Sequence, residues 1–175
     1  MKSQTFVFWL LLVLPGLAQQ PRENDAMKDC PMHDEHSGHH DAVERHGDQA
    51  MGFPHDKTTH HFRLMSNGGA VEVNVNNPDD NTNMQAVRAH LKHIATLFSN
   101  GDFSTPMFIH DGVPPGATTM KLMKKEIHYT YEESASGGRV RMQTDAPIAV
   151  AAIHDFIRFQ ITEHQTGDSL EEPKN

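Results

Sequence analysis

Cysteine, positive charge and long apolar runs are all scarce in this chain. The single cysteine, Cys30, excludes an internal disulfide bond. The 15 Lys and Arg residues are outnumbered by 23 Asp and Glu residues, which gives a net charge of −8 at pH 7. This acidic balance argues against nucleic acid and anionic membranes as main partners. The longest apolar run, Phe6 to Leu14, is shorter than the ~20 residues of a membrane-spanning helix, so we expect no membrane span.

Catalytic motifs are also missing. The chain has no Gly-x-Ser-x-Gly, no phosphate-binding glycine loop, no Cys-x-x-Cys-His and no His-Glu-x-x-His sequence. What it has in excess is histidine, at 14 residues, and methionine, at 10. Both residue types supply donor atoms for soft or borderline metal ions, so the functional interpretation depends on where they lie.

Residues 1–18 are predicted to be a secretory signal peptide. The apolar run ends at Pro15. Small residues at Gly16 and Ala18 then favour cleavage before Gln19. We therefore expect an exported protein, either periplasmic or secreted. The alternative is a signal anchor that is not cleaved.

Residues 19–57 are mostly polar and lack a sustained hydrophobic periodicity, which predicts a disordered tail. The tail contains a Cys-Pro-Met-His sequence followed by further histidines. Its candidate metal ligands are Cys30, Met32, His33, His36, His39 and His40. Thiolate, thioether and neutral imidazole groups together suit copper or zinc, and a flexible chain can fold around one ion. The alternatives are a solvated tail that binds nothing specific, or a Cys30 that pairs with a second chain.

Residues 58–168 show the alternation and helical spacing of an α+β domain. The order strand, strand, helix occurs twice, in halves of about 58–102 and 126–168. The predicted strands are 58–65, 70–76, 126–132 and 139–144, and the predicted helices are 84–102 and 147–165. We expect an internal ββα-ββα repeat that forms a four-stranded antiparallel sheet with two helices on one face.

The two halves are joined by a long connection, residues 103–125. Within it, residues 107–109 are predicted to be extended and residues 117–125 to form a short helix. A connection of this length inside a compact domain is often functional. After the second half, residues 169–175 are predicted to be a disordered C-terminus.

Four histidines of the domain are further candidate metal ligands. His90 and His93, three residues apart on the first predicted long helix, would point the same way. Strand alternation places His60 on the buried face with Phe62, and His110 lies in the long connection. A metal site could combine His90 and His93 with either His60 or His110. The alternative is that His90 and His93 are two surface residues on the flank of the helix.

The chain also contains short segments that are typical of one group of proteins. They are Thr59-His60-His61-Phe62-Arg63-Leu64, Gly68-Gly69, Arg88-Ala89-His90-Leu91-Lys92-His93-Ile94-Ala95, Gly101-Asp102-Phe103 and Phe159-Gln160-Ile161. In these segments the chain resembles exported bacterial proteins without an assigned role, which are sometimes labelled aspartate carbamoyltransferases. The Ser-Thr-Arg-Thr phosphate loop of that enzyme family is not in this chain. The resemblance therefore implies export and the segment boundaries, but no chemistry.

These features favour an exported transition-metal-binding protein that captures, buffers or delivers copper or zinc. Cys30-Pro31-Met32-His33 agrees with this interpretation, because it resembles short heavy-metal-binding segments of copper-handling proteins. Two alternatives stay open. The exposed face of the sheet could bind another envelope protein, with metal binding incidental. A metal held by His90 and His93 could instead activate a water molecule in a small enzyme.

Overall fold

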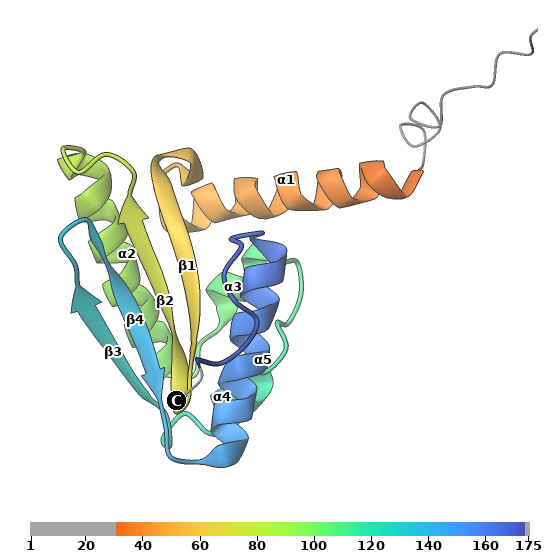
Figure 1. The fold of residues 1–175 in the computed structure, drawn as a ribbon, viewed down its shortest axis with the longest axis vertical. Coiled ribbons are helices and arrows are strands. Elements are labelled where there is room, and N and C mark those ends of the chain that lie inside the picture. Colours follow the sequence, from red (N-terminus) through yellow and green to blue (C-terminus); the bar gives the residue numbers. More distant parts are fainter. Residues whose placement is uncertain (1–30, 174–175) are drawn as a thin grey trace, which may run out of the picture.

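The computed structural model describes residues 31–173, which form an antiparallel sheet with helices packed on one face (Figure 1). In chain order the elements are α1 (Pro31–Met51), the 3-10 helix η1 (His55–Lys57), β1 (Thr58–Met65), β2 (Gly68–Val75), α2 (Asn81–Ser99), α3 (Ser104–Ile109), α4 (Ala117–Leu122), β3 (His128–Glu133), β4 (Gly137–Gln143) and α5 (Pro147–Glu163). The strand order is β1-β2-β4-β3, and all neighbouring strands are antiparallel. This confirms the predicted four-stranded α+β fold. The order ββα occurs in both halves, but a duplication stays a prediction.

The hairpin between β1 and β2 fixes which side chains face the helices. Gly68 follows a two-residue turn with a φ of 144°, and a Cβ there would lie 1.9 Å from a backbone carbonyl oxygen of β4, so glycine is required. The resulting register pairs His60 with Val73. Val73 is buried in the core, so His60 also lies on the face that the helices cover.

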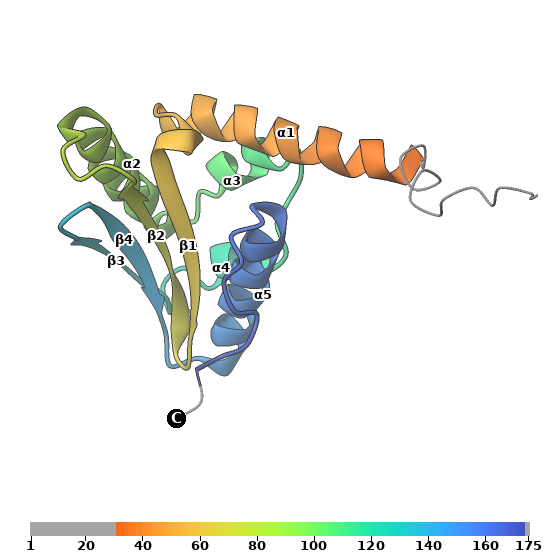
Figure 2. The same cartoon turned by 45° about the horizontal axis from the view of Figure 1, so that its top comes forward.

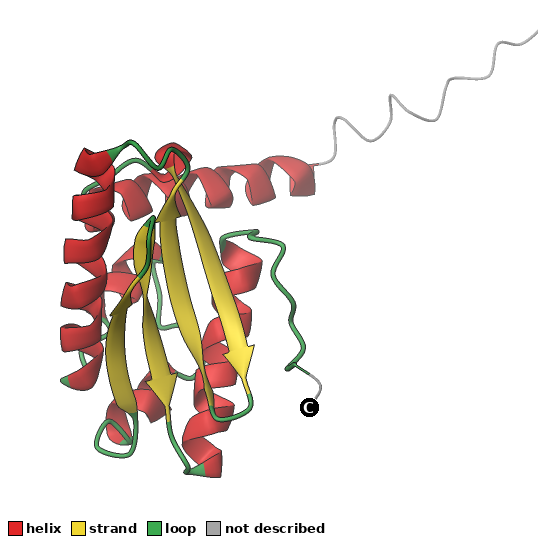
Figure 3. Ribbon diagram, turned by 60° about the vertical axis from the view of Figure 1, so that its left-hand side comes forward, coloured by secondary structure: helices red, strands yellow, loops and turns green. Residues whose placement is uncertain are grey.

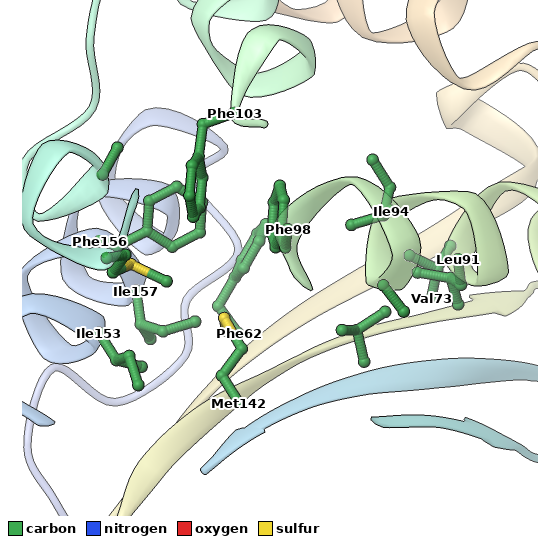
Figure 4. Packing of buried hydrophobic residues seen from close by; sticks show 14 of the residues in the cluster. Phe62, Val73, Leu91, Ile94, Phe98, Phe103, Met142, Ile153, Phe156 and Ile157 are labelled. Carbon is green, nitrogen blue, oxygen red and sulfur yellow. The ribbon is translucent and has the colours of Figure 1, made fainter. Parts of the chain in front are cut away.

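Two long helices cover this face, and the opposite face of the sheet is open (Figure 3). α2 packs mainly over β3 and β4, and α5 packs over β1 and β2. Figure 4 shows the core between them, where aromatic rings from three segments meet. Phe98 stacks on Phe103 with ring centroids 4.6 Å apart, and Phe156 meets Phe98 edge-on at 5.9 Å. No helix between residues 31 and 173 combines the length and apolar character needed to cross a membrane.

α1 lies across one end of the sheet and runs past α3, as Figures 1 and 2 show. The predicted disordered tail extended to residue 57, but residues 38–57 are folded against the domain. Val43 is 1% exposed and Phe53 is 3% exposed, which anchors this segment by apolar burial. The sequence shows no amphipathic pattern for this helix, because few of its residues are apolar and contact the domain. The predicted signal peptide and residues 19–30 of the predicted tail lie outside the described residues.

The connection between α2 and β3 also differs in part from the prediction. Residues 107–109, predicted to be extended, form the end of α3, whereas the short helix predicted at 117–125 is present as α4. Asp102 favours the start of α3, because its carboxylate accepts a hydrogen bond from the Ser104 backbone N–H at 2.9 Å. The connection also places Phe103 in the core.

The segment after α5 turns back along the domain, and its contacts reach Leu170 in the range 169–175 that was predicted to be disordered. Asp168 accepts a hydrogen bond from the Phe62 backbone N–H at 2.9 Å, so the segment covers the exposed edge of β1 (Figure 3). Arg158 then donates through Nε to the Leu170 carbonyl oxygen at 3.0 Å. These contacts hold the end of α5 beside the start of β1.

Candidate metal-binding site

A cavity of about 230 Å³ lies between α1, the start of β1 and the end of α5. Its polar lining is mainly histidine. The side chains that matter for its chemistry are His40, Glu44, Met51, His55, His60 and His164. Segments far apart in the sequence therefore bring four imidazole rings, a carboxylate and a thioether to one cavity.

His60 and Met51 are in direct contact at the wall of this cavity. Strand alternation turns His60 toward the helices, two residues before the buried Phe62. Met51 is the last residue of α1, and its Sδ lies 3.2 Å from His60 Nε2. A thioether is only a weak hydrogen-bond acceptor, so it satisfies a buried imidazole nitrogen poorly. Both groups are, however, good ligands for a soft metal ion.

His164 lines the same cavity from the end of α5, on the same covered face of the sheet. It is the residue immediately after α5, and its ring stacks on His60 with centroids 6.2 Å apart and an angle of 7° between the planes. The ring also stacks on Phe62 at 5.4 Å and meets His110 edge-on at 5.0 Å. His60, His164 and His110 thus form a row of contacting imidazoles between β1 and α5.

A smaller cavity of about 70 Å³ adjoins the first. The two share Met51, His60 and His164, and the smaller one adds His90 from α2. Its remaining lining is largely apolar, and the His90 ring meets Phe53 edge-on with centroids 5.7 Å apart. His60 and His90, both predicted as metal ligands, therefore line the same smaller cavity.

Burial keeps these imidazoles neutral. Desolvation, together with smaller contributions from the neighbouring His90 and His55, lowers the pKa of His60 to about 4. Desolvation also lowers the pKa of His90 to about 4 and that of His164 to about 3. A neutral imidazole has a free lone pair and needs no deprotonation to bind a metal ion, so these rings are in their metal-binding form at neutral pH.

The predicted pair on α2 does not act as a pair in this geometry. His90 faces the pocket, whereas His93 is exposed on the flank of the helix. His110 lies beyond His164, where its Nε2 is 3.1 Å from Gln160 Oε1. His60 and His110 were both considered as partners of His90, and His60 is the one that lines the same cavity.

The predicted ligands of the tail fall in three groups. Cys30 lies outside the described residues. Met32, His33 and His36 belong to the first turns of α1, but their side chains lie outside the described part of the structure. His40 lines the larger cavity, and His39 contacts Glu163 of α5 at 2.6 Å. Because α1 is a helix, these residues are spread along its length rather than free to fold around one ion.

Four of these pocket side chains were missed from the sequence: Glu44, Met51, His55 and His164. A signal existed for His164, since it follows Ile157 and Ile161 of the apolar stripe of α5 at helical spacing. No comparable signal existed for the other three, because their segment was predicted to be disordered. Their place in the pocket depends on the docking of α1.

Among the residues that the structure describes, no three His, Cys, Asp or Glu side chains already converge as a metal centre. The contact between His60 and Met51 is of a different kind, because one partner is a sulfur of methionine. No family model, curated protein or solved structure matches this chain. The geometry of the pocket is therefore the main guide to what the protein binds.

Proposed function

We propose that the protein is exported and captures a transition-metal ion, Cu(I) in preference to Zn(II), in the pocket beneath α1. The observation that carries this proposal is the 3.2 Å contact between the neutral His60 imidazole and the Met51 sulfur. Thioether sulfur selects Cu(I), whereas imidazole suits copper and zinc alike. α1 lies at the edge of the domain and forms one wall of the pocket, so its movement could admit or release an ion. This agrees with a role in buffering or delivery.

The spacing of the two donor atoms supports this assignment. A metal bound to imidazole nitrogen at ~2.0 Å and to sulfur at ~2.3 Å holds these donors ~3.5 Å apart in tetrahedral geometry. The observed 3.2 Å differs from that value by a fraction of an ångström. His164 and His40 line the same cavity, whose volume of about 230 Å³ gives their rings room to rotate toward a bound ion. Either ring would supply a third ligand.

The open face of the sheet gives less support to a protein-interaction module. Its strongest charges already pair with one another within the face. Arg139 contacts Glu132 at 2.6 Å through both Nε and Nη2, and Arg141 contacts the same carboxylate at 3.2 Å. A partner protein would have to compete with these pairs, so metal capture is the better-supported function.

The proposal can be tested by competing the full chain against a chromogenic Cu(I) chelator under anaerobic conditions. Met51→Leu removes the sulfur while nearly conserving volume, so the fold should be retained. We expect the variant to bind Cu(I) at least about tenfold more weakly, or ~1.4 kcal/mol. The affinity for Zn(II) should change less, because zinc does not require the thioether.

Met107→Leu is the matched control. Met107 is 40% exposed and lies outside both cavities, so its loss should leave Cu(I) affinity unchanged. Both variants keep the same N-terminal segment, so any binding there cancels in the comparison. Equal Cu(I) affinity in the Met51 and Met107 variants would refute the pocket as the copper site.

A further inference from the structure

Two histidines and a carboxylate come near one another where α1, the end of α3 and α5 meet, although they do not yet converge as metal ligands. Glu163 Oε2 is 2.6 Å from His39 Nε2 and 3.7 Å from His110 Nδ1. His39 comes from α1, His110 is the residue after α3, and Glu163 is the last residue of α5. None of these three side chains lines either cavity, so the group is separate from the pocket.

The hydrogen bonding of His110 leaves the lone pair of its Nδ1 buried and without a donor in the described part of the chain. Its Nε2 is 3.1 Å from the Gln160 side-chain oxygen, which can only accept, so Nε2 carries the proton and Nδ1 does not. The His110 side chain is 1% exposed, and its Nδ1 has no hydrogen-bond partner among the described residues. That lone pair faces the Glu163 carboxylate 3.7 Å away, and two electron-rich atoms repel each other unless a proton or a metal cation lies between them.

A bound metal ion would remove this conflict. Histidines that bind metals commonly donate the other ring N–H to a carbonyl oxygen or carboxylate, as His110 does to Gln160. In a tetrahedral zinc site, nitrogen and oxygen donors lie ~2.0–2.2 Å from the metal and hence ~3.4 Å from one another. The two observed distances, 2.6 Å and 3.7 Å, lie on either side of that spacing. The His39 side chain is 52% exposed and is free to move by the small amount required.

We propose that His39 Nε2, His110 Nδ1 and a Glu163 carboxylate oxygen form a second metal site that takes Zn²⁺ and clamps α1 to α5. Two imidazoles and one carboxylate are a borderline-to-hard donor set, which suits Zn²⁺ and contrasts with the sulfur of the pocket. Three protein ligands leave the fourth position to water. Because the ion joins helices from opposite ends of the chain, its binding also fixes α1 over the pocket.

The test uses Co²⁺ as a spectroscopic substitute for Zn²⁺, titrated into the full chain and into His39→Ala and Glu163→Gln. The native protein should develop the intense visible absorption of tetrahedral cobalt, and Zn²⁺ should displace it. Each variant should lose that absorption and bind at least about tenfold more weakly. His93→Ala, which removes an exposed histidine of α2, should keep the native spectrum.

Amide hydrogen exchange supplies a second readout. Zn²⁺ should slow exchange along α1 in the native protein and should not do so in His39→Ala, because the clamp to α5 is then missing. The site would be overturned if native protein gave no tetrahedral cobalt spectrum, or if His39→Ala and Glu163→Gln both kept it. Met51→Leu separates the two sites, because loss of the Cu(I) pocket alone leaves the cobalt spectrum in place.

Discussion

The face of the sheet that the helices cover has two unlike halves. In one half, side chains such as Met142, Ile153 and Ile157 are fully buried and pack without polar partners. In the other half, beneath α1, His60, His90 and His164 line cavities of about 230 and 70 Å³. Among the described residues, the one hydrogen-bond contact of these three rings is that of His60 with Met51.

The two halves differ in what they contribute to stability, because the buried histidines do not stabilise the fold as the aliphatic side chains do. Burying an imidazole without a good hydrogen bond costs free energy, whereas an aliphatic side chain in the same place would stabilise the domain. The apolar half therefore serves folding, whereas the proposed metal binding would account for the histidine half. Changes to the two halves should accordingly have different consequences.

The largest effect should follow from removing α1, which covers the histidine half. A chain that begins at Thr58 lacks Val43 and Phe53, and each of these buried side chains stabilises by about 1.5–3 kcal/mol. We expect its unfolding midpoint in denaturant to fall well below that of the full chain. A chain that begins at Gly38 keeps both side chains and should unfold near the native midpoint. An unchanged midpoint for the shorter chain would show that α1 contributes no stability.

Truncation in the apolar half should come next in size. Ile157 is completely buried and packs against Gly69 of β2, where an added Cβ would lie 2.9 Å from its side chain. Ile157→Ala should lower the free energy of unfolding by about 2–5 kcal/mol, because close packing prevents the cavity from collapsing. Cu(I) affinity of the folded variant should be nearly native. A loss of affinity as large as that of Met51→Leu would mean that the two halves are not independent.

Acid should destabilise the protein through the histidine half. In the unfolded chain these histidines take up protons near pH 6.5, but burial lowers the pKa of His60 to about 4 in the folded chain. Between these values the unfolded state binds more protons, so this stability is complete above pH 6.5 and declines as the pH falls toward 4. Each such histidine contributes a slope of about 1.4 kcal/mol per pH unit.

Denaturant unfolding at several pH values between 6.5 and 5 measures this slope. His60→Gln removes one of the titrating groups, so the slope of the free energy of unfolding against pH should fall by the contribution of one histidine. If the His60→Gln variant kept the native slope, His60 would not be held neutral by burial.

The smallest effect is expected at His93 itself. Its side chain is exposed, so His93→Ala should change the free energy of unfolding by no more than about 0.5 kcal/mol. Leu91→Ala, on the buried face of the same helix, should lose about 2–5 kcal/mol. Equal losses in denaturant melts of the two variants would place His93 in the core and contradict the orientation of α2.

Much of this architecture follows from local sequence pattern. The predicted strand at 58–65 matches β1, and the start of the second long helix at Pro147 is also as predicted. Alternation along β1 was sufficient to place His60 on the covered face. Such signals succeed because strands and amphipathic helices repeat their apolar positions at a fixed period.

The pocket could be predicted only in part, because its members meet through tertiary contacts. Met51 reaches His60 only once α1 docks, and that docking depends mainly on Val43 and Phe53, too few positions to give a periodic signal. Which of His90 and His93 faces the domain was left open for a related reason. A spacing of three residues places two side chains on neighbouring faces, but only packing decides which of them points inward.

If a metal ion binds at His60 and Met51 as we propose, the methyl group of Met51 reports on it directly. The measurement is NMR of protein labelled with ¹³C at the methionine methyl groups, recorded during titration with Cu(I). We predict that the Met51 methyl resonance shifts and saturates within the first equivalents, while that of the exposed Met107 stays in place. A Met51 resonance that does not move while copper binds elsewhere on the chain would contradict metal binding at His60 and Met51.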